Sequence, residues 1–95
     1  MEGKASISAE ILGRYAGDAA GEVDGVQALS GRRSVRLSDG ESGMRVEVHL
    51  RVEWGAAIPA VGRAVQERVH EYLEQMADVH AAAVEVVVDE IGAPG

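Results

Sequence analysis

The chain contains no cysteine, no phenylalanine and no threonine, and these absences restrict its chemistry. Without cysteine there can be no disulfide and no thiolate metal site, which fits a reducing compartment such as the cytoplasm. Without cysteine, threonine or a Gly-x-Ser-x-Gly sequence, the usual nucleophiles of covalent catalysis have no recognisable setting. We therefore expect a protein that is not an enzyme and has no cofactor.

Aromatic residues are also scarce, because only Tyr15, Trp54 and Tyr72 are present. Valine and alanine supply much of the 46% hydrophobic share. Burial of apolar surface stabilises a fold by about 25 cal/mol per Å², and these small side chains bury little surface each. The 95 residues suffice for a single domain, with a core between about residues 5 and 91 and a disordered tail at 92–95. So thin a core favours self-association as a homo-oligomer.

Long apolar runs are missing as well. The longest stretch without a charged residue spans nine residues, Trp54 to Gly62, whereas a bilayer crossing needs about 20. We therefore expect no direct membrane insertion, and the first residues lack the apolar core of a signal peptide. The net charge of −7 repels polyanions, so we expect no nucleic-acid partner. We interpret the local cluster of Arg32, Arg33 and Arg36 as solvated loop charge.

Strict alternation marks the clearest secondary structure. From Met44 to Trp54 apolar residues alternate with charged ones over eleven residues, which predicts a long strand buried on one face. Turn-forming residues at 38–43, and the alternation at 34–37 before them, predict a hairpin with both apolar sets on one side. The opposite face forms a candidate protein interface and carries Arg45, Glu47, His49, Arg51 and Glu53.

Helical spacing occurs on both sides of this strand. Apolar residues recur at three- and four-residue intervals from Ile58 to Val79, which predicts an amphipathic helix of about twenty residues with Pro59 in its first turn. Earlier in the chain, Ser8 is the expected N-cap of a helix that ends near Gly25. Extended segments at 5–7 and 26–29 and a last strand at 84–89 complete the pattern. It predicts an α+β fold, a two-layer sandwich with two helices packed on one face of a small, mostly antiparallel sheet.

Glycine recurs inside the first predicted helix. Gly13, Gly17 and Gly21, here called the glycine stripe, lie four residues apart, although each lowers helix stability by about 1 kcal/mol relative to alanine. A helical projection places the stripe opposite the apolar face. Two interpretations stay open: the stripe docks a second copy or a partner, or glycine is tolerated on an exposed surface. Gly62 in the second helix lies nearer the core, where it would permit close packing.

Trp54 and the histidines are the other candidates for function. Trp54 ends the long strand and is either an interface anchor or a cap over the core. His49, His70 and His80 are dispersed, with no pair at the spacing of a helical metal site, so we interpret them as solvent-facing and expect no metal. The carboxylates of the long strand lie on an open sheet face, which is a poor setting for acid–base catalysis.

Taken in order, these segments resemble the alkaline shock protein family, also called envelope stress response proteins. The resemblance spans about Ala5 to Ile91 and rests on the order of the segments rather than on one motif. In the first half the matching residues are Ile7-Ser8-Ala9-Glu10-Ile11-Leu12, Ala16, Ala19-Ala20, Val23 and Gly25-Val26. In the second half they are Val46 to Glu53, Trp54-Gly55, Ile58-Pro59, Val65-Gln66, Val69, Met76 and Val84 to Asp89. Ala9 stands where the family often has proline, and neither the glycine stripe nor Tyr15 is expected of it.

The resemblance implies a bacterial, cytoplasmic, non-enzymatic protein linked to envelope or alkaline stress. Some members are held near the membrane by a partner membrane protein, and the family offers no catalytic residues. Our hypothesis is therefore a self-associating structural or adaptor module with a membrane-anchored protein partner. An alternative is a regulatory module that binds a soluble enzyme.

Overall fold

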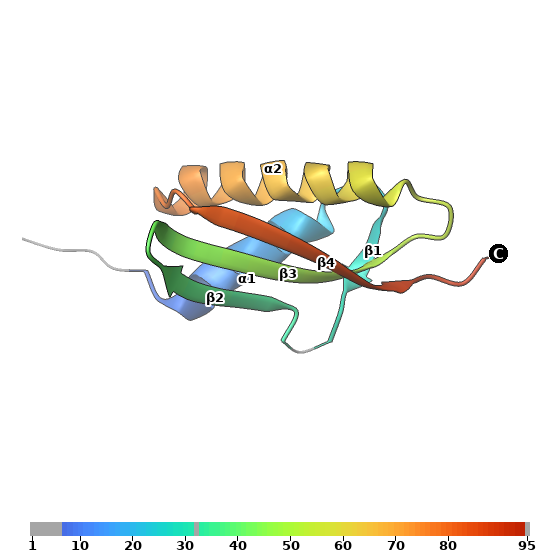
Figure 1. Ribbon diagram of the computed structural model, residues 1–95, viewed down its shortest axis with the longest axis horizontal. Helices are drawn as coiled ribbons and strands as arrows, with labels where there is room; N and C mark the ends of the chain where they lie inside the picture. The colour runs from blue at the N-terminus through green and yellow to red at the C-terminus, as the bar shows by residue number, and fades with distance from the viewer. Residues whose placement is uncertain (1–6, 32, 95) are drawn as a thin grey trace, which may run out of the picture.

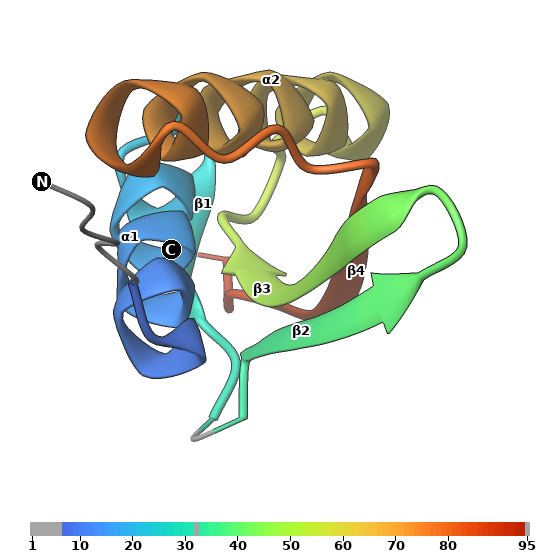
Figure 2. The ribbon, with the colours of Figure 1, turned by 90° about the vertical axis from the view of Figure 1, so that its left-hand side faces the viewer.

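The computed structural model describes residues 7–31 and 33–94, in which two helices and four strands follow one another (Figure 1). This arrangement confirms the predicted α+β fold, with both helices packed against one face of the sheet (Figure 2). Arg32 and most of the extended segment expected at 5–7 lie outside the described residues. The order of the elements is α1 (Ala9–Gly21), β1 (Val26–Leu29), β2 (Val35–Gly40), β3 (Gly43–Val52), α2 (Ile58–Ala77) and β4 (Ala83–Ile91).

The sheet is built around β3, which is hydrogen-bonded along both of its edges. β1 pairs antiparallel with residues 50–52 of β3, and β2 pairs antiparallel with residues 43–48. His49 joins the two stretches, because its carbonyl accepts from the Ser30 N–H at 2.9 Å and its N–H donates to the Ser34 carbonyl at 2.7 Å. β1 and β2 therefore act as one interrupted strand on the same edge of β3. The predicted hairpin is present, with its apolar residues facing the core.

β4 runs parallel to β3 along the other edge, so one of the three strand pairings departs from the antiparallel arrangement. A parallel pair needs a long crossover, and α2 supplies it. The pairing slips by one residue between Val88 and Glu90, which leaves Asp89 as a bulge in β4. Just beyond the strand, the Gly92 N–H donates to the Val52 carbonyl at 2.7 Å, so the first residue of the expected tail still bonds to β3.

Local signals account for both helices. The Ser8 Oγ accepts a hydrogen bond from the Ile11 N–H at 3.3 Å, as expected for the N-cap of α1. α1 ends at Gly21, earlier than predicted, because the Glu22 N–H bonds back to carbonyls one turn before it. α2 has the predicted first residue and a length of 20 residues. In the ranges 7–31 and 33–94, neither helix is both long and apolar enough to cross a membrane.

The core lies between the helices and the inner face of the sheet. α1 and α2 also contact each other through Tyr15 and Tyr72, whose ring centroids are 5.8 Å apart at an interplanar angle of 65°. Gly62 does not mediate close packing as expected, because a methyl group added there would meet no neighbouring heavy atom of the described chain within 4 Å. The buried apolar residues are small, which agrees with the expectation of a thin core: Leu12, Ala16, Ala19, Ala20, Val26, Val46, Val48, Leu50, Val52, Val61, Val65, Val69 and Leu73.

Candidate protein interface

The outer face of the sheet carries four of the five charged residues predicted for the long strand, since Glu53 lies beyond its end. They alternate with four fully buried residues that point toward the helices, so the predicted two-faced strand is present. Charged residues of β2 and β4 flank these charges on the same face. Glu47, for example, lies between Arg36 of β2 and Glu85 of β4. The fold therefore brings together on one surface Arg45, Glu47, His49 and Arg51, whereas Glu53 lies beyond the end of β3, in the loop that leads to α2.

Ion pairs with β4 already neutralise much of this surface. Arg45 bonds to Glu85, and Arg51 bonds to Glu90 through Nε at 3.0 Å and also through Nη2. These side chains are about half exposed, so each pair contributes about 0–1 kcal/mol to stability. A protein that docked here would have to desolvate charges that already have partners, which weakens this face as an interface.

His49 lies at the centre of the charged face, and its side chain is only 21% exposed. Its Nε2 lies 2.7 Å from a Glu47 oxygen and its Nδ1 lies 2.8 Å from an Asp89 oxygen. The hydrogen bond to Glu47, followed by that to Asp89, raises the pKa of His49 above its ordinary value. His49 thus lies on the solvent side of the sheet, but its ring is held between two carboxylates. The sequence could not reveal the contact between His49 and Asp89, because it depends on the bulge in β4, where both Asp89 and Glu90 reach side chains of β3.

The other two histidines, which are ten residues apart in the sequence, meet at one carboxylate near the end of α2. His80 Nδ1 lies 2.7 Å from Glu74 Oε1, and His70 Nε2 lies 3.3 Å from the same oxygen. Across the described residues, no group of three or more histidine, cysteine, aspartate or glutamate side chains is arranged to hold a metal ion.

One residue of the glycine stripe, Gly17, faces the protein interior, which corrects the predicted placement at that position. Gly17 is buried, and a methyl group added there would lie 3.1 Å from the Leu29 side chain. A methyl group at Gly13 would lie 3.9 Å from Val35, whereas the surroundings of Gly21 are open. The projection failed because α1 packs against the interrupted β1–β2 strand as well as against α2, so its buried arc is wider than its apolar stripe. The centre of the stripe is therefore covered by the protein itself, whereas Gly13 is half-buried and Gly21 is exposed.

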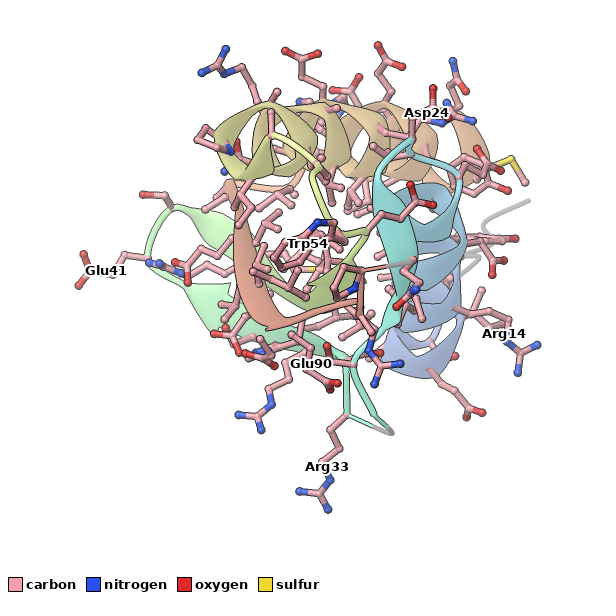
Figure 3. The ribbon with its side chains drawn as sticks, turned by 90° about the vertical axis from the view of Figure 1, so that its right-hand side faces the viewer. Arg14, Asp24, Arg33, Glu41, Trp54 and Glu90 are labelled. Carbon is pink, nitrogen blue, oxygen red and sulfur yellow. The ribbon has the colours of Figure 1, made fainter. Side chains whose placement is uncertain are left out.

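Trp54 projects from the end of the molecule where β3 finishes (Figure 3) and is 63% exposed, so it does not cap the core. It borders a shallow hollow of about 270 Å³ together with Ile58, at the start of α2, and Ile91, at the end of β4. We call these three residues the Trp54 cluster. Neither isoleucine was a predicted site residue, because only the fold brings the three segments together.

Comparison with protein families decides the relationship of this chain to known proteins. A model of the alkaline shock protein 23 family, described as having a cell envelope-related function, matches residues 30–93. The chain belongs to this family. The family resemblance noted in the sequence is thereby confirmed.

Two sets of known proteins are similar to this family member. YqhY, an uncharacterized protein of Bacillus subtilis (strain 168), is 30% identical in an alignment of 89 positions, and the match covers 78% of this chain and 66% of YqhY. The chain thus spans slightly less than two thirds of the relative's length. Among solved structures, a variant of the MamM C-terminal domain has a TM-score of 0.68 at 15% identity, covering 88% of this chain and 84% of that one. A manganese form of another MamM variant has a TM-score of 0.59 at 14% identity, covering 87% and 99%. At such low identity the likeness shows the fold alone.

Proposed function

We propose that this protein is a non-enzymatic structural or adaptor module with a cell envelope-related role. It self-associates and is recruited from the cytoplasm to the membrane by a protein partner. The exposed Trp54 cluster carries the proposal, because contiguous apolar side chains at a surface mark a contact site, whereas scattered ones do not. The family's described cell envelope-related function supports the biological setting.

The Trp54 cluster is suited to binding because rigid elements hold it. Its members are 63%, 39% and 52% exposed and extend from the ends of β3, α2 and β4, so little ordering is needed on association. Covering a large apolar side chain contributes about 1.5–3 kcal/mol, and tryptophan is the residue most enriched among interface hot spots. We assign self-association to this cluster.

The charged outer face of the sheet supports a non-enzymatic role. Its ionisable side chains pair with one another across β3 and β4 at an open surface. General acids and bases usually lie in clefts, where desolvation and nearby charges shift their pKa.

Sedimentation velocity of the purified chain tests self-association. Trp54→Ser should weaken it at least about tenfold, since the anchor of the apolar cluster is removed. Met76→Ser is the matched control, because Met76 is 48% exposed but lies on the last turn of α2, far along the helix from the cluster. A wild-type chain that stays monomeric at all concentrations, or equal effects of both variants, would contradict this assignment.

Affinity capture from native lysate tests recruitment to the membrane. The tagged chain is captured after the membrane fraction has been solubilised in mild detergent, and retained proteins are identified by mass spectrometry. An integral membrane protein, enriched over a capture with unrelated tagged protein, is the expected result. Recovery of a soluble enzyme alone, with no chain sedimenting with membranes, would favour the regulatory module instead.

A further inference from the structure

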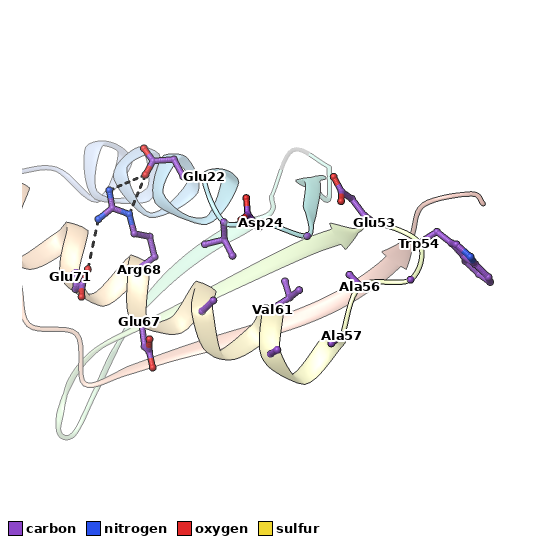
Figure 4. Close-up of a pocket in the computed structure, with 15 residues that line it drawn as sticks. Glu22, Asp24, Glu53, Trp54, Ala56, Ala57, Val61, Glu67, Arg68 and Glu71 are labelled. Atoms are coloured by element: carbon purple, nitrogen blue, oxygen red, sulfur yellow. Dashed lines mark hydrogen bonds and ion pairs between the residues drawn. The ribbon is translucent and has the colours of Figure 1, made fainter. Parts of the chain in front are cut away.

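A second surface feature lies beside α2. It is a groove of about 850 Å³ between residues 22–25, which follow α1, the loop at 53–57 and the part of α2 from Ala60 to Glu71 (Figure 4). Gly25 forms part of its wall with φ at 93°, and a methyl group added there would lie 2.6 Å from the Val61 side chain, so only glycine fits. Small apolar side chains make up much of the lining: Val23, Ala56, Ala57, Ala60, Val61 and Ala64.

The rim of the groove is strongly acidic. Five carboxylates and one guanidinium line it, a net charge of −4. The single cation, Arg68, bonds to Glu22 at 2.9 and 3.1 Å and lies 3.8 Å from Glu71, so it is already shared between two carboxylates. No lysine or arginine in the described part of the chain forms an ion pair with the other three, which are Asp24, Glu53 and Glu67.

We propose that this acidic groove binds a basic amphipathic helix of another protein, with small apolar residues on one side and lysine or arginine on its flanks. Three alanines face the groove: Ala57 is the N-cap of α2, and Ala60 and Ala64, inside the helix, lie four residues apart and thus on one side of it. Because these side chains are short, a second helix can approach α2 closely, since the interaxial distance depends on the side chains at the contact. The unpaired carboxylates then meet the flanking cations of the bound helix.

Charge selects the occupant. A second copy of this chain carries a net charge of −7, so it would bring like charge toward the rim. A cationic segment gains attraction at the rim and faster association at low salt. A basic helix gives the partner of the proposed adaptor a defined chemistry. This inference rests on the proposed function only in one respect, namely that the protein acts by binding other proteins.

Two synthetic peptides of about 18 residues, or about five helical turns, test the groove. Both lack tryptophan and share the same alanine and leucine positions, but the flanking positions are lysine in one and glutamate in the other. Trp54 is the single tryptophan of the chain and lines one end of the groove, so its fluorescence reports binding. The lysine peptide should give a saturable change that weakens with salt, and the glutamate peptide should give none. Amide NMR shifts at Gly25 provide a second readout.

Matched variants distinguish binding in the groove from attraction of the peptide to the overall negative charge of the protein. Ala64→Arg should weaken binding of the lysine peptide at least about tenfold by filling the floor, and Glu67→Lys about fivefold by reversing a rim charge. Ala82→Arg and Glu41→Lys make the same chemical changes at exposed positions outside the groove and should leave binding unchanged. Thermal unfolding checks each fold, and Ala60→Arg, at an exposed position, replaces Ala64→Arg if that variant does not fold.

Several results would overturn the proposal. They are no binding of the lysine peptide, equal binding of both peptides, or equal weakening by the groove and control variants. Loss of self-association in Ala64→Arg would instead assign the groove to a second copy. The Trp54→Ser sedimentation experiment does not depend on these peptides, so the proposed function and this inference can fail separately.

Discussion

The glycine stripe offers a sharp test of how α1 packs. Replacing each glycine of an exposed helix by alanine should raise stability by about 1 kcal/mol, because glycine loses more backbone entropy on folding. If the stripe lay on an exposed surface, Gly13→Ala and Gly17→Ala would stabilise the protein equally. The structure predicts a difference between them.

The difference follows from two distances. The alanine methyl group at position 13 would lie 3.9 Å from Val35 Cγ1, which is an ordinary contact, so the full gain of about 1 kcal/mol is expected. At position 17 it would lie 3.1 Å from Leu29 Cδ1, so this side chain must shift by a few tenths of an ångström. Moving a side chain away from its preferred rotamer costs about 0.5–1.5 kcal/mol, which offsets the helical gain. Gly17→Ala should therefore change stability by less than about 0.5 kcal/mol.

Equilibrium unfolding in urea, with thermal unfolding as a second probe, measures both variants. Gly13→Ala should raise the melting temperature by about 4–8 °C, as about 1 kcal/mol does for a domain of this size. Gly17→Ala should leave it nearly unchanged, and Gly17→Leu, which cannot be accommodated, should lower stability by about 1–3 kcal/mol. Equal stabilisation by both alanine variants would refute the inward placement of Gly17. Neither alanine variant should alter self-association.

Two further predictions concern the charged face and the core. Because Glu47 and Asp89 raise the pKa of His49, the protonated form of His49 stabilises the fold. This contribution to the unfolding free energy is fully present below the unfolded pKa of about 6.5, and it is lost as the pH rises through the higher pKa of the folded state. The difference in unfolding free energy between wild type and His49→Gln should thus shrink as pH rises through this range, and a pH-independent difference would contradict it. Leu73→Ala, at a fully buried position, should cost about 2–5 kcal/mol in urea unfolding, and a loss below about 1 kcal/mol would mean that the thin core collapses around the cavity.

Local periodicity determined most of the architecture of this protein. The alternation from Met44 onward, the helical spacing after Ile58 and the cap at Ser8 each depend on neighbouring residues, and each element is present in the structure. A strand with period two and a helix with period 3.6 have their buried faces set by these intervals alone. The family relationship was also visible at this level, because it rests on the order of such segments.

Tertiary structure decided how the surfaces are used. The contact of His49 with Asp89 at the bulge, the Trp54 cluster, the burial of Gly17 and the acidic groove all join segments that are distant in sequence. Pattern along the chain reports which residues share a face of one element, but not which second element covers that face. That choice depends on the balance of packing and solvation between elements, so it is made only when the helices meet the sheet.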